Sequence, residues 1–326
     1  MKVLRICAAK GRQIRGDDMR KLNIKRTAGT ALAALLFAFS IIYIIEESVA
    51  MTERPLFTQM PSVEASGTAV KSASNATVDY SNARDGYVMV KFDGNPSDKI
   101  KVRVKGPDNV DYTYDLASNG EYNVFPLTSG KGSYTVTVFK NIKGTSYSTE
   151  LKLNLTANIT DEFAPFLRPN QYVDYSKDSA CVLKAAELAA GASEELDVVK
   201  KVYNFVIKNF TYDKAKAMNL RSDYICDLDY IFEARTGICL DYAALMTAML
   251  RSQGIPTKMV FGYSGSVYHA WINVYSEKDG WISNAIYFDG NSWKLMDPTF
   301  ASTQKESDSI MNYIGDGANY TSKYTY

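Results

Sequence analysis

The sequence predicts an α+β protein in which an all-β region precedes a region of helices followed by antiparallel strands. In residues 78–157, short runs alternate between polar and apolar side chains, and turn residues separate these runs about every ten positions. Beyond Pro165 and Pro169, helical patterns come first and strand patterns follow. A third feature is the uncharged stretch 28–45, which predicts a hydrophobic helix near the N-terminus.

The composition is that of a globular protein with two domains. Of its 326 residues, 46% are hydrophobic and 22% are charged, and domains usually hold about 100–200 residues each. The formal net charge is +1 and no basic stripe follows the N-terminal segment, so we expect no nucleic-acid partner. The chain has a single histidine, whereas imidazole-based metal sites usually need more than one. We therefore expect neither a metal nor a cofactor.

Charges of opposite sign flank the stretch 28–45. This stretch is just long enough to span a bilayer. Basic residues that include Arg20 and Arg26 precede it, and Glu46 and Glu47 follow it. Because positive flanks stay in the cytoplasm, everything after residue 46 is predicted to be extracytoplasmic, either secreted or anchored to the outer face of the membrane.

Two outcomes remain open for this N-terminal segment. Ser48, Val49 and Ala50 offer the small residues that a signal peptidase reads, and Met19 could be the true start of a signal peptide of ordinary shape. Without cleavage, residues 28–45 would hold the protein in the membrane. In both cases the working part of the chain lies outside the cytoplasm.

We divide the chain into four parts. Residues 1–50 are predicted to be a cytoplasmic basic segment with a signal peptide or membrane anchor, 51–77 a linker, 78–160 a β-sandwich, and 161–326 a second folded domain. The sandwich prediction depends on strands at 87–92, 100–105, 112–114, 134–138 and 151–155. Residues 132–136 resemble the late strands of immunoglobulin-like or fibronectin-like modules. A protein or carbohydrate ligand of this sandwich remains open, because a fold by itself identifies no ligand.

Three helices and three strands are predicted in the second domain. The first helix spans 178–190 and ends at Gly191. Ser193 would cap the second helix, and the third runs from about Leu240 to Arg251. The buried stripe of the second helix is Val198, Val199, Val202, Phe205 and Val206. The strands are at 259–261, 270–275 and 293–296.

The four cysteines are Cys7, Cys181, Cys226 and Cys239. None belongs to a C-x-x-C pair, so the spacing does not suggest zinc. Two interpretations remain for Cys181 and Cys226, because they could form a disulfide or could be small buried side chains. Cys239 is a free thiol in both interpretations.

Cys239, His269 and Asp297 are the candidate catalytic residues. A cysteine nucleophile needs an ionised thiol, a base beside it and a group that orients the base. Cys239 begins a predicted helix, where unpaired N–H groups and the helix dipole stabilise a thiolate. Gly237 would let a substrate backbone approach this thiol closely. His269 opens one predicted strand and Asp297 ends another, so the carboxylate could accept the imidazole N–H from a neighbouring strand.

Several short motifs resemble those of the transglutaminase-like superfamily. They are Gly237-x-Cys239 with Asp241-Tyr242-Ala243, Gly254-Ile255-Pro256, Gly262-Tyr263, His269-Ala270-Trp271 and Asp297-Pro298-Thr299. The resemblance covers about residues 195–300 and does not extend to 1–160. It implies a papain-like fold for a transglutaminase-like catalytic domain at 161–326, with Cys239 as nucleophile, His269 as base and Asp297 as orienting residue. One departure is the long segment 276–291 between the His269 and Asp297 strands, a segment that could shape the cleft.

The resemblance implies a cysteine-dependent acyl transferase or hydrolase that acts on an extracellular protein or peptide. Hydrolysis of peptide or amide bonds through a thioester at Cys239 is our first interpretation, and crosslinking by a true transglutaminase is the second. The third is a non-catalytic surface binding module, and the presence of all three triad residues argues against it.

Two groups of aromatic residues have an open role in this chemistry. The Cys239 N–H could be one oxyanion donor, and Tyr212 is a candidate for the second, although packing is its more ordinary role. Trp271, Trp281 and Trp293 could line an acceptor tunnel, and their more ordinary role is also core packing.

Overall fold

A computed structural model describes residues 60–326, except for 222, 265, 284–285, 289–292 and 296–319. The predictions for residues 1–50, including the hydrophobic stretch 28–45, lie outside the described residues, and so does Asp297. Within the described part of the chain, no helix is both long enough and apolar enough to cross a membrane.

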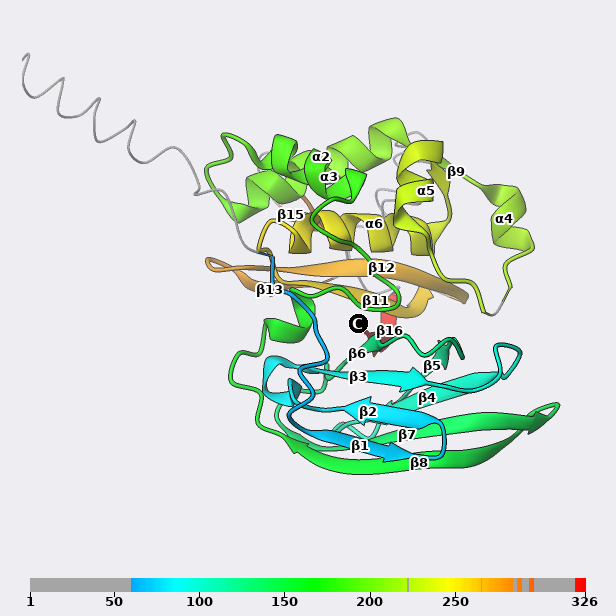
Figure 1. The fold of residues 1–326 in the computed structure, drawn as a ribbon. Helices are drawn as coiled ribbons and strands as arrows, with labels where there is room; N and C mark the ends of the chain where they lie inside the picture. The colour runs from blue at the N-terminus through cyan, green and yellow to red at the C-terminus, as the bar shows by residue number, and fades with distance from the viewer. Residues whose placement is uncertain (1–59, 222, 265, 284–285, 289–292, 296–319) are drawn as a thin grey trace, which may run out of the picture. The chain divides into compact units, whose positions relative to one another are not determined.

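Two four-stranded antiparallel sheets make up an N-terminal β-rich region (Figure 1). The first sheet has the order β1-β2-β3-β6, with bounds Val70–Ala73, Ala76–Asp79, Tyr87–Phe92 and Asn123–Pro126. The second has the order β5-β4-β7-β8, with bounds Asp111–Leu116, Ile100–Lys105, Gly132–Lys143 and Ser146–Ala157. The predicted strands of this region all fall within β3, β4, β5, β7 and β8.

Alternation along the strands builds the core of this region, as β4 illustrates. Ile100, Val102 and Val104 of β4 are buried, whereas the lysines and arginine between them are half-buried. The strands begin earlier than the sequence predicts, since β1 and part of β2 fall within the predicted linker 51–77. We attribute the difference to the position of β1 at a sheet edge, where its mostly exposed side chains provide no apolar face to recognise.

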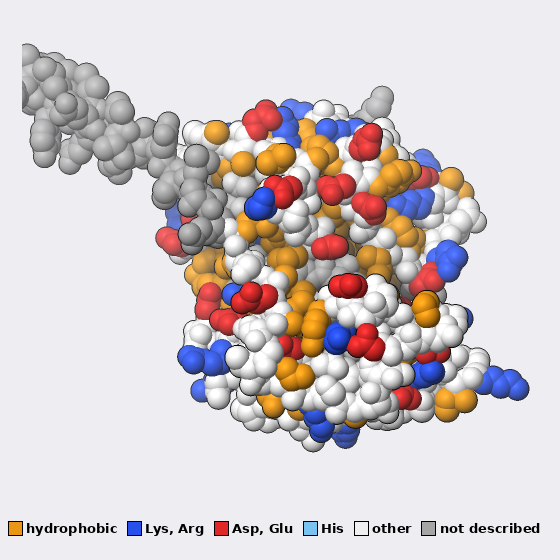
Figure 2. Space-filling view, viewed as in Figure 1, with side chains coloured by type: hydrophobic (Ala, Val, Ile, Leu, Met, Phe, Trp, Pro, Cys, Tyr) orange, Lys and Arg blue, Asp and Glu red, His pale blue; other side chains and the backbone are white. Residues whose placement is uncertain are grey.

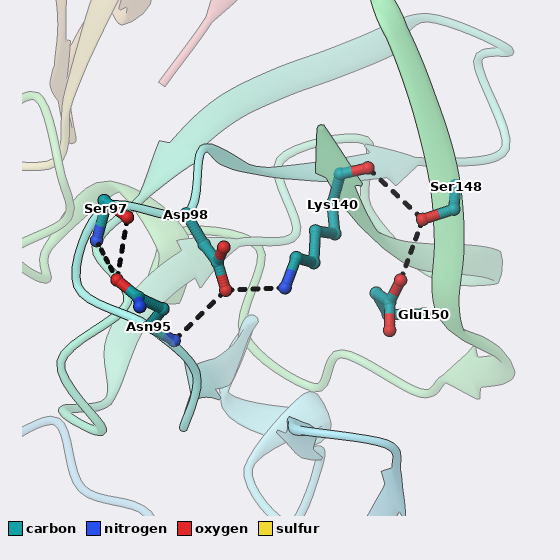
Figure 3. Close-up of polar contacts among 6 residues, drawn as sticks. All are labelled: Asn95, Ser97, Asp98, Lys140, Ser148 and Glu150. Carbon is teal, nitrogen blue, oxygen red and sulfur yellow. Dashed lines mark hydrogen bonds and ion pairs between the residues drawn. The ribbon is translucent and has the colours of Figure 1, made fainter. Parts of the chain in front are cut away.

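Polar contacts fasten the loop between β3 and β4 to β7 (Figure 3). Oδ2 of Asp98 accepts hydrogen bonds from Lys140 Nζ at 2.7 Å and from the Asn95 N–H at 3.1 Å. The Lys140 ammonium lowers the pKa of the Asp98 carboxyl from its ordinary value. On β8, the single hydroxyl proton of Ser148 can be donated to Glu150 Oε1, 2.8 Å from Ser148 Oγ, or to the Lys140 carbonyl oxygen at 3.3 Å. These contacts join strands of the second sheet at its surface.

Helices followed by an antiparallel sheet form the second region, as the α+β prediction requires. The helices are α2 (Ala180–Ala189), α3 (Glu195–Asn209), α4 (Lys214–Met218), α5 (Leu228–Ala234) and α6 (Cys239–Arg251). The sheet has the order β13-β12-β11-β16, with bounds Gly280–Ile282, Val267–Ser276, Thr257–Ser264 and Tyr320–Thr325. Figure 1 shows α2, α3, α5 and α6 gathered on one side of this sheet, and α6 packs directly against β11 and β12.

The start of α3 and two short helices correct the sequence interpretation. α3 begins at Glu195 with Glu194 at its N-cap, so the predicted cap at Ser193 is wrong by one residue, and no side chain caps this helix. The predicted stripe of α3 is confirmed for its valines, which are buried, and Phe205 is partly buried. The short helices α4 and α5 were not predicted, because five and seven residues show too little periodicity.

Arg251 joins three separate parts of the chain at the C-terminal end of α6. Its fully buried guanidinium donates to the carbonyls of Thr257 at 2.9 Å, Arg168 at 2.6 Å and Tyr326 at 2.8 Å. Burial lowers the pKa of Arg251 to about 10. The Tyr326 ring in turn packs edge-on against Tyr112 of β5 at 5.5 Å, so this junction reaches the β-rich region.

Candidate active site

Cys239 is the first residue of α6. The Ile238 backbone before it is extended (φ −108°, ψ −179°), and the Ile238 N–H donates to Oδ2 of Asp241 at 2.9 Å. The Cys239 side chain is half-buried, and the cysteine is a free thiol. Because the first N–H groups of a helix have no carbonyl one turn earlier, these groups can donate to a negative charge that develops beside Cys239.

A short parallel pair of strands fixes the chain just before Cys239. β9 (Thr211–Tyr212) runs beside β10 (Thr236–Gly237), and the Asp213 N–H donates to the Gly237 carbonyl at 2.8 Å. Tyr212 is the register partner of Gly237, so it lies beside the approach to Cys239. This position is consistent with the predicted oxyanion role of Tyr212, which stays a proposal.

Arg235 turns the chain from α5 into β10. Its φ of 55° lies in the left-handed region, which is uncommon for a residue with a side chain. The guanidinium carbon lies 4.1 Å from the ring centroid of Phe232, 5.0 Å from that of Phe210 and 5.1 Å from that of Phe205. These cation–π contacts hold the turn that leads into the nucleophile loop.

His269 lies near the start of β12 and is buried, with 6% of its surface exposed. It is paired with Gly262 of β11. Because side chains alternate along a strand, His269 and Trp271 share one face of β12. Any side chain at Gly262 would collide with the ring of Trp271 and with the backbone of Thr321 on β16, which explains the glycine opposite His269.

The strand that leads to Asp297 does not pair with the His269 strand in the part of the chain that the structure describes. β15 (Trp293–Leu295) pairs with β14 (Ile286–Phe288), whereas β12 pairs with β11 and β13. The structure thus brings together the helix that begins with Cys239 and the strand that carries His269. The contact between Asp297 and His269 stays a prediction, because Asp297 lies outside the described residues.

Asp241 is a site residue whose role the sequence interpretation missed. It is completely buried, and its carboxylate accepts hydrogen bonds from Ile238 N–H, from Lys216 Nζ at 2.6 Å and from the Tyr224 hydroxyl at 2.7 Å. A side chain at Gly237 would collide with Asp241, whose atoms would come within 2.7 Å of the added carbon. The group that approaches Gly237 closely in the structure is therefore the Asp241 side chain, and the approach of a substrate backbone stays a prediction. A signal was present in the sequence, because an acid three residues after an N-cap position is one half of a capping box.

The other two described cysteines are poor nucleophiles. Cys181 and Cys226 are free and buried in the structure, which agrees with the interpretation as small buried side chains. Burial raises the pKa of the Cys181 thiol to about 12. Burial, together with the nearby Asp241 carboxylate, also raises the pKa of Cys226 strongly. Cys239 is thus the described thiol that is best placed to react.

The two tryptophans whose side chains are described differ in burial. Trp271 is fully buried, so it has the core-packing role. Trp281 is half-buried and packs among aromatic rings, 5.5 Å from that of Phe166 and 5.6 Å from that of Tyr275. Lys258 Nζ lies 3.7 Å from the centroid of the Trp281 ring. The side chain of Trp293 lies outside the described residues.

A large cavity of the described residues does not belong to this site. It has a volume of about 750 Å³, and strands β4 and β5 line it together with Arg221, Asp223 and Ile225, but neither Cys239 nor His269 does. A cavity of about 460 Å³ is lined by Asp174, Asp227 and Asp229 among others. Figure 2 shows one face on which acidic side chains border a hollow. Neither of these cavities is lined by Cys239 or His269. We therefore assign the site from the nucleophile and the base.

Comparison with known proteins supports this assignment. Residues 184–298 match the model of the transglutaminase-like superfamily, and this segment includes all three predicted triad residues. Over residues 184–298 the chain is therefore similar to the core domain of the transglutaminase-like superfamily.

Three similar proteins illustrate the relationship. The uncharacterised protein YebA of Bacillus subtilis is 29% identical over 118 residues, which cover 30% of this chain and 16% of YebA. A protein-glutamine gamma-glutamyltransferase of Pseudomonas aeruginosa is 33% identical over 69 residues, which cover 17% of this chain and 10% of that protein. The periplasmic domain of TgpA from Pseudomonas aeruginosa superposes with a TM-score of 0.33 and 16% identity, covering 72% of this chain and 98% of that domain. The matched segments thus span less than a fifth of the two curated relatives.

Proposed function

We propose that this protein is an extracytoplasmic cysteine enzyme that forms a thioester acyl-enzyme at Cys239 and hydrolyses peptide or amide bonds in proteins. The observation that carries the proposal is the free, half-buried Cys239 at the start of α6, packed against the strand that bears His269. The match of residues 184–298 to the transglutaminase-like model supports it.

The reaction follows from the chemistry of these groups. The Cys239 thiolate attacks the carbonyl carbon of an amide, and the N–H of Cys239 is placed to donate to the resulting oxyanion. The C–N bond breaks, His269 gives its proton to the leaving amine, and a thioester remains on Cys239. Water then attacks the thioester while His269 takes its proton, so that the acid leaves and the thiol is restored. Asp297 would orient His269 through the second ring nitrogen.

A true transglutaminase is the second candidate, because the printed name of the Pseudomonas aeruginosa relative describes glutamine acyl transfer. The two activities share the acyl-enzyme and differ only in whether water or a lysine-type amine accepts the acyl group. The third candidate, a non-catalytic surface module, draws on the large cavity beside β4 and β5, which could hold a protein or carbohydrate ligand.

Mass spectrometry of substrate peptides separates these candidates. The purified protein is incubated with glutamine-containing peptides, with and without an added primary amine. A cut backbone or a released side-chain amide indicates hydrolysis, and a peptide that gains the amine indicates transfer. The product should be lost in Cys239→Ala and kept in Cys181→Ala, which removes a buried thiol instead. No product with any peptide, from a protein whose Cys239 also resists alkylation, would leave only the binding module.

The extracytoplasmic location rests on the charges that flank residues 28–45, which lie outside the described residues. A protease added to cells with a permeable outer envelope should digest the region after residue 51. Complete protection of that region would reject this location without affecting the chemistry.

A further inference from the structure

We propose that Lys216 and Asp241 form a charge-compensating positioning pair, which keeps the first turn of α6 electrically neutral around Cys239 and holds the segment 213–226 against it. The inference rests on the proposed function, in which Cys239 is the nucleophile. Lys216 is not part of any of the short motifs that carry the resemblance.

The buried carboxylate lies at the same end of α6 as the nucleophile. Side chains two positions apart on a helix do not normally face each other, but Asp241 turns back along the helix to accept the N–H of Ile238 at 2.9 Å. The carboxylate oxygen is therefore hydrogen-bonded to the residue that directly precedes Cys239. A lone negative charge at this place would oppose formation of the thiolate.

Lys216 supplies the positive charge that balances the buried Asp241 carboxylate. Its Nζ lies 2.6 Å from the same Oδ2 atom, and its side chain is 23% exposed while that of Asp241 is fully buried. Among the described residues, the other titratable groups that face Asp241 are the Tyr224 hydroxyl and the Cys226 thiol. Burial and the Asp241 carboxylate both raise the pKa of Tyr224, so this group stays neutral. Lys216 is thus the counter-charge that the described residues present to Asp241.

The same pair holds the middle of a segment whose two ends are fixed separately. At these ends, the Asp213 N–H donates to the Gly237 carbonyl at 2.8 Å and Cys226 is buried. Between them, α4 buries none of its residues, and Met218 and Leu220 are 80% and 43% exposed. Among the described residues of this stretch, the side chains that bond to α6 are those of Lys216 and Tyr224, both to Asp241. Charge compensation and attachment of the segment therefore depend on the same contact.

The experiment measures alkylation of Cys239 by iodoacetamide between pH 5 and pH 9 in the full-length protein, with mass spectrometry reporting each cysteine separately. In Lys216→Met the lone carboxylate should move the alkylation curve to higher pH and slow labelling at pH 7 about ten-fold. In Asp241→Asn the unopposed ammonium should move the curve to lower pH. The double variant should return to within about three-fold of the unaltered protein, because both charges are gone.

Opposite shifts with mutual rescue distinguish charge compensation from a purely structural contact. A structural contact would give changes in one direction, with the double variant at least as impaired as either single variant, and that result would overturn the proposal. Lys214→Met removes an exposed charge from the same short helix and should leave the curve in place. If Lys216→Met fails to fold, the isosteric Asp241→Asn variant still decides, because an unchanged curve or a shift to higher pH contradicts the pair.

Unfolding and failure of the proposed function are both visible in the same data. Labelling of the buried Cys181 and Cys226 reports unfolding. If Cys239 in the unaltered protein reacts no faster than these two, the nucleophile assignment fails. If Cys239 reacts fast but the variants do not shift in opposite directions, only the role of the pair fails.

Discussion

The two ends of α6 each hold a completely buried charged residue, and the two charges are satisfied in different ways. At the start, Asp241 meets the Lys216 ammonium and the Tyr224 hydroxyl from a partly exposed segment, and the buried N–H of Ile238. At the end, Arg251 meets the main-chain carbonyls of three separate segments. A charge balanced by another charge can tune a neighbouring reactive group, whereas a charge satisfied by backbone oxygens mainly fixes where those segments lie. Changes at the first end should therefore affect chemistry, and changes at the second end should affect stability.

The largest effect should come from the triad at the first end of α6. Cys239→Ala should remove acyl-enzyme formation entirely, and His269→Ala should cost nearly as much. Asp297→Ala should slow acylation by about two to four orders of magnitude, by analogy with other triads. Adding Asp297→Ala to His269→Ala should then do little more, because there is no imidazole left to orient. Burst kinetics of acylation measure these losses, and near-normal thermal unfolding of each variant is the control. A well-folded, fully active His269→Ala protein would refute the site, since the chain has no second histidine.

An intermediate effect, on stability alone, is expected at the second end. Arg251→Met keeps much of the side-chain volume but leaves three carbonyls without their buried donor, so the free energy of unfolding should fall by about 3 kcal/mol. Urea denaturation measures this loss. Acylation by the folded fraction should stay close to normal, because Arg251 lies at the opposite end of the helix from Cys239. The exposed Arg221→Met change is the matched control and should leave stability within about 0.5 kcal/mol. Equal stability of Arg251→Met and the unaltered protein would contradict the structural role of this charge.

The smallest effect should be on the pH dependence of the free energy of unfolding, through the ionisation of Tyr326, whose main chain contacts Arg251. Burial raises the pKa of Tyr326 far above its ordinary value of 10.0. Above pH 10 the unfolded chain therefore loses the Tyr326 proton while the folded protein keeps it, so stability is retained below pH 10 and falls as the pH rises. Tyr326→Phe should reduce that decline by about 1.4 kcal/mol per pH unit. Urea denaturation at pH 8.5, 10 and 11 measures the slope. An identical slope in the variant would show that this hydroxyl ionises equally in both states.

The same contrast between the ends of α6 explains which features the sequence predicts. The start of α6 at Cys239 and the strand at 100–105 follow from local patterns, since a few neighbouring residues decide a helix start or an alternating strand. The contact between Lys216 and Asp241 joins residues 25 positions apart, and nothing in either neighbourhood indicates the other. The three partners of Arg251 are likewise defined only after the chain has folded.

Elements that depend on distant partners account for the remaining differences. β16 has no strong pattern of its own and is stabilised by pairing with β11. β15 was predicted beside the His269 strand, but a sequence does not specify which strand is its neighbour, and in the structure it pairs with β14. The long-range contacts of Lys216 and Arg251 are thus less visible in the sequence than the triad residues.

The position of β16 along the chain has a consequence for how the protein is made. β16 covers one side of β11, and Tyr326, which follows it, supplies a carbonyl to Arg251 and exchanges two hydrogen bonds with Met259. Until residues 320–326 have left the ribosome, β11 is an open strand with unpaired backbone groups, of the kind that recruits other chains. A nascent or truncated chain that ends before residue 320 should therefore aggregate, even though it already contains Cys239, His269 and Asp297.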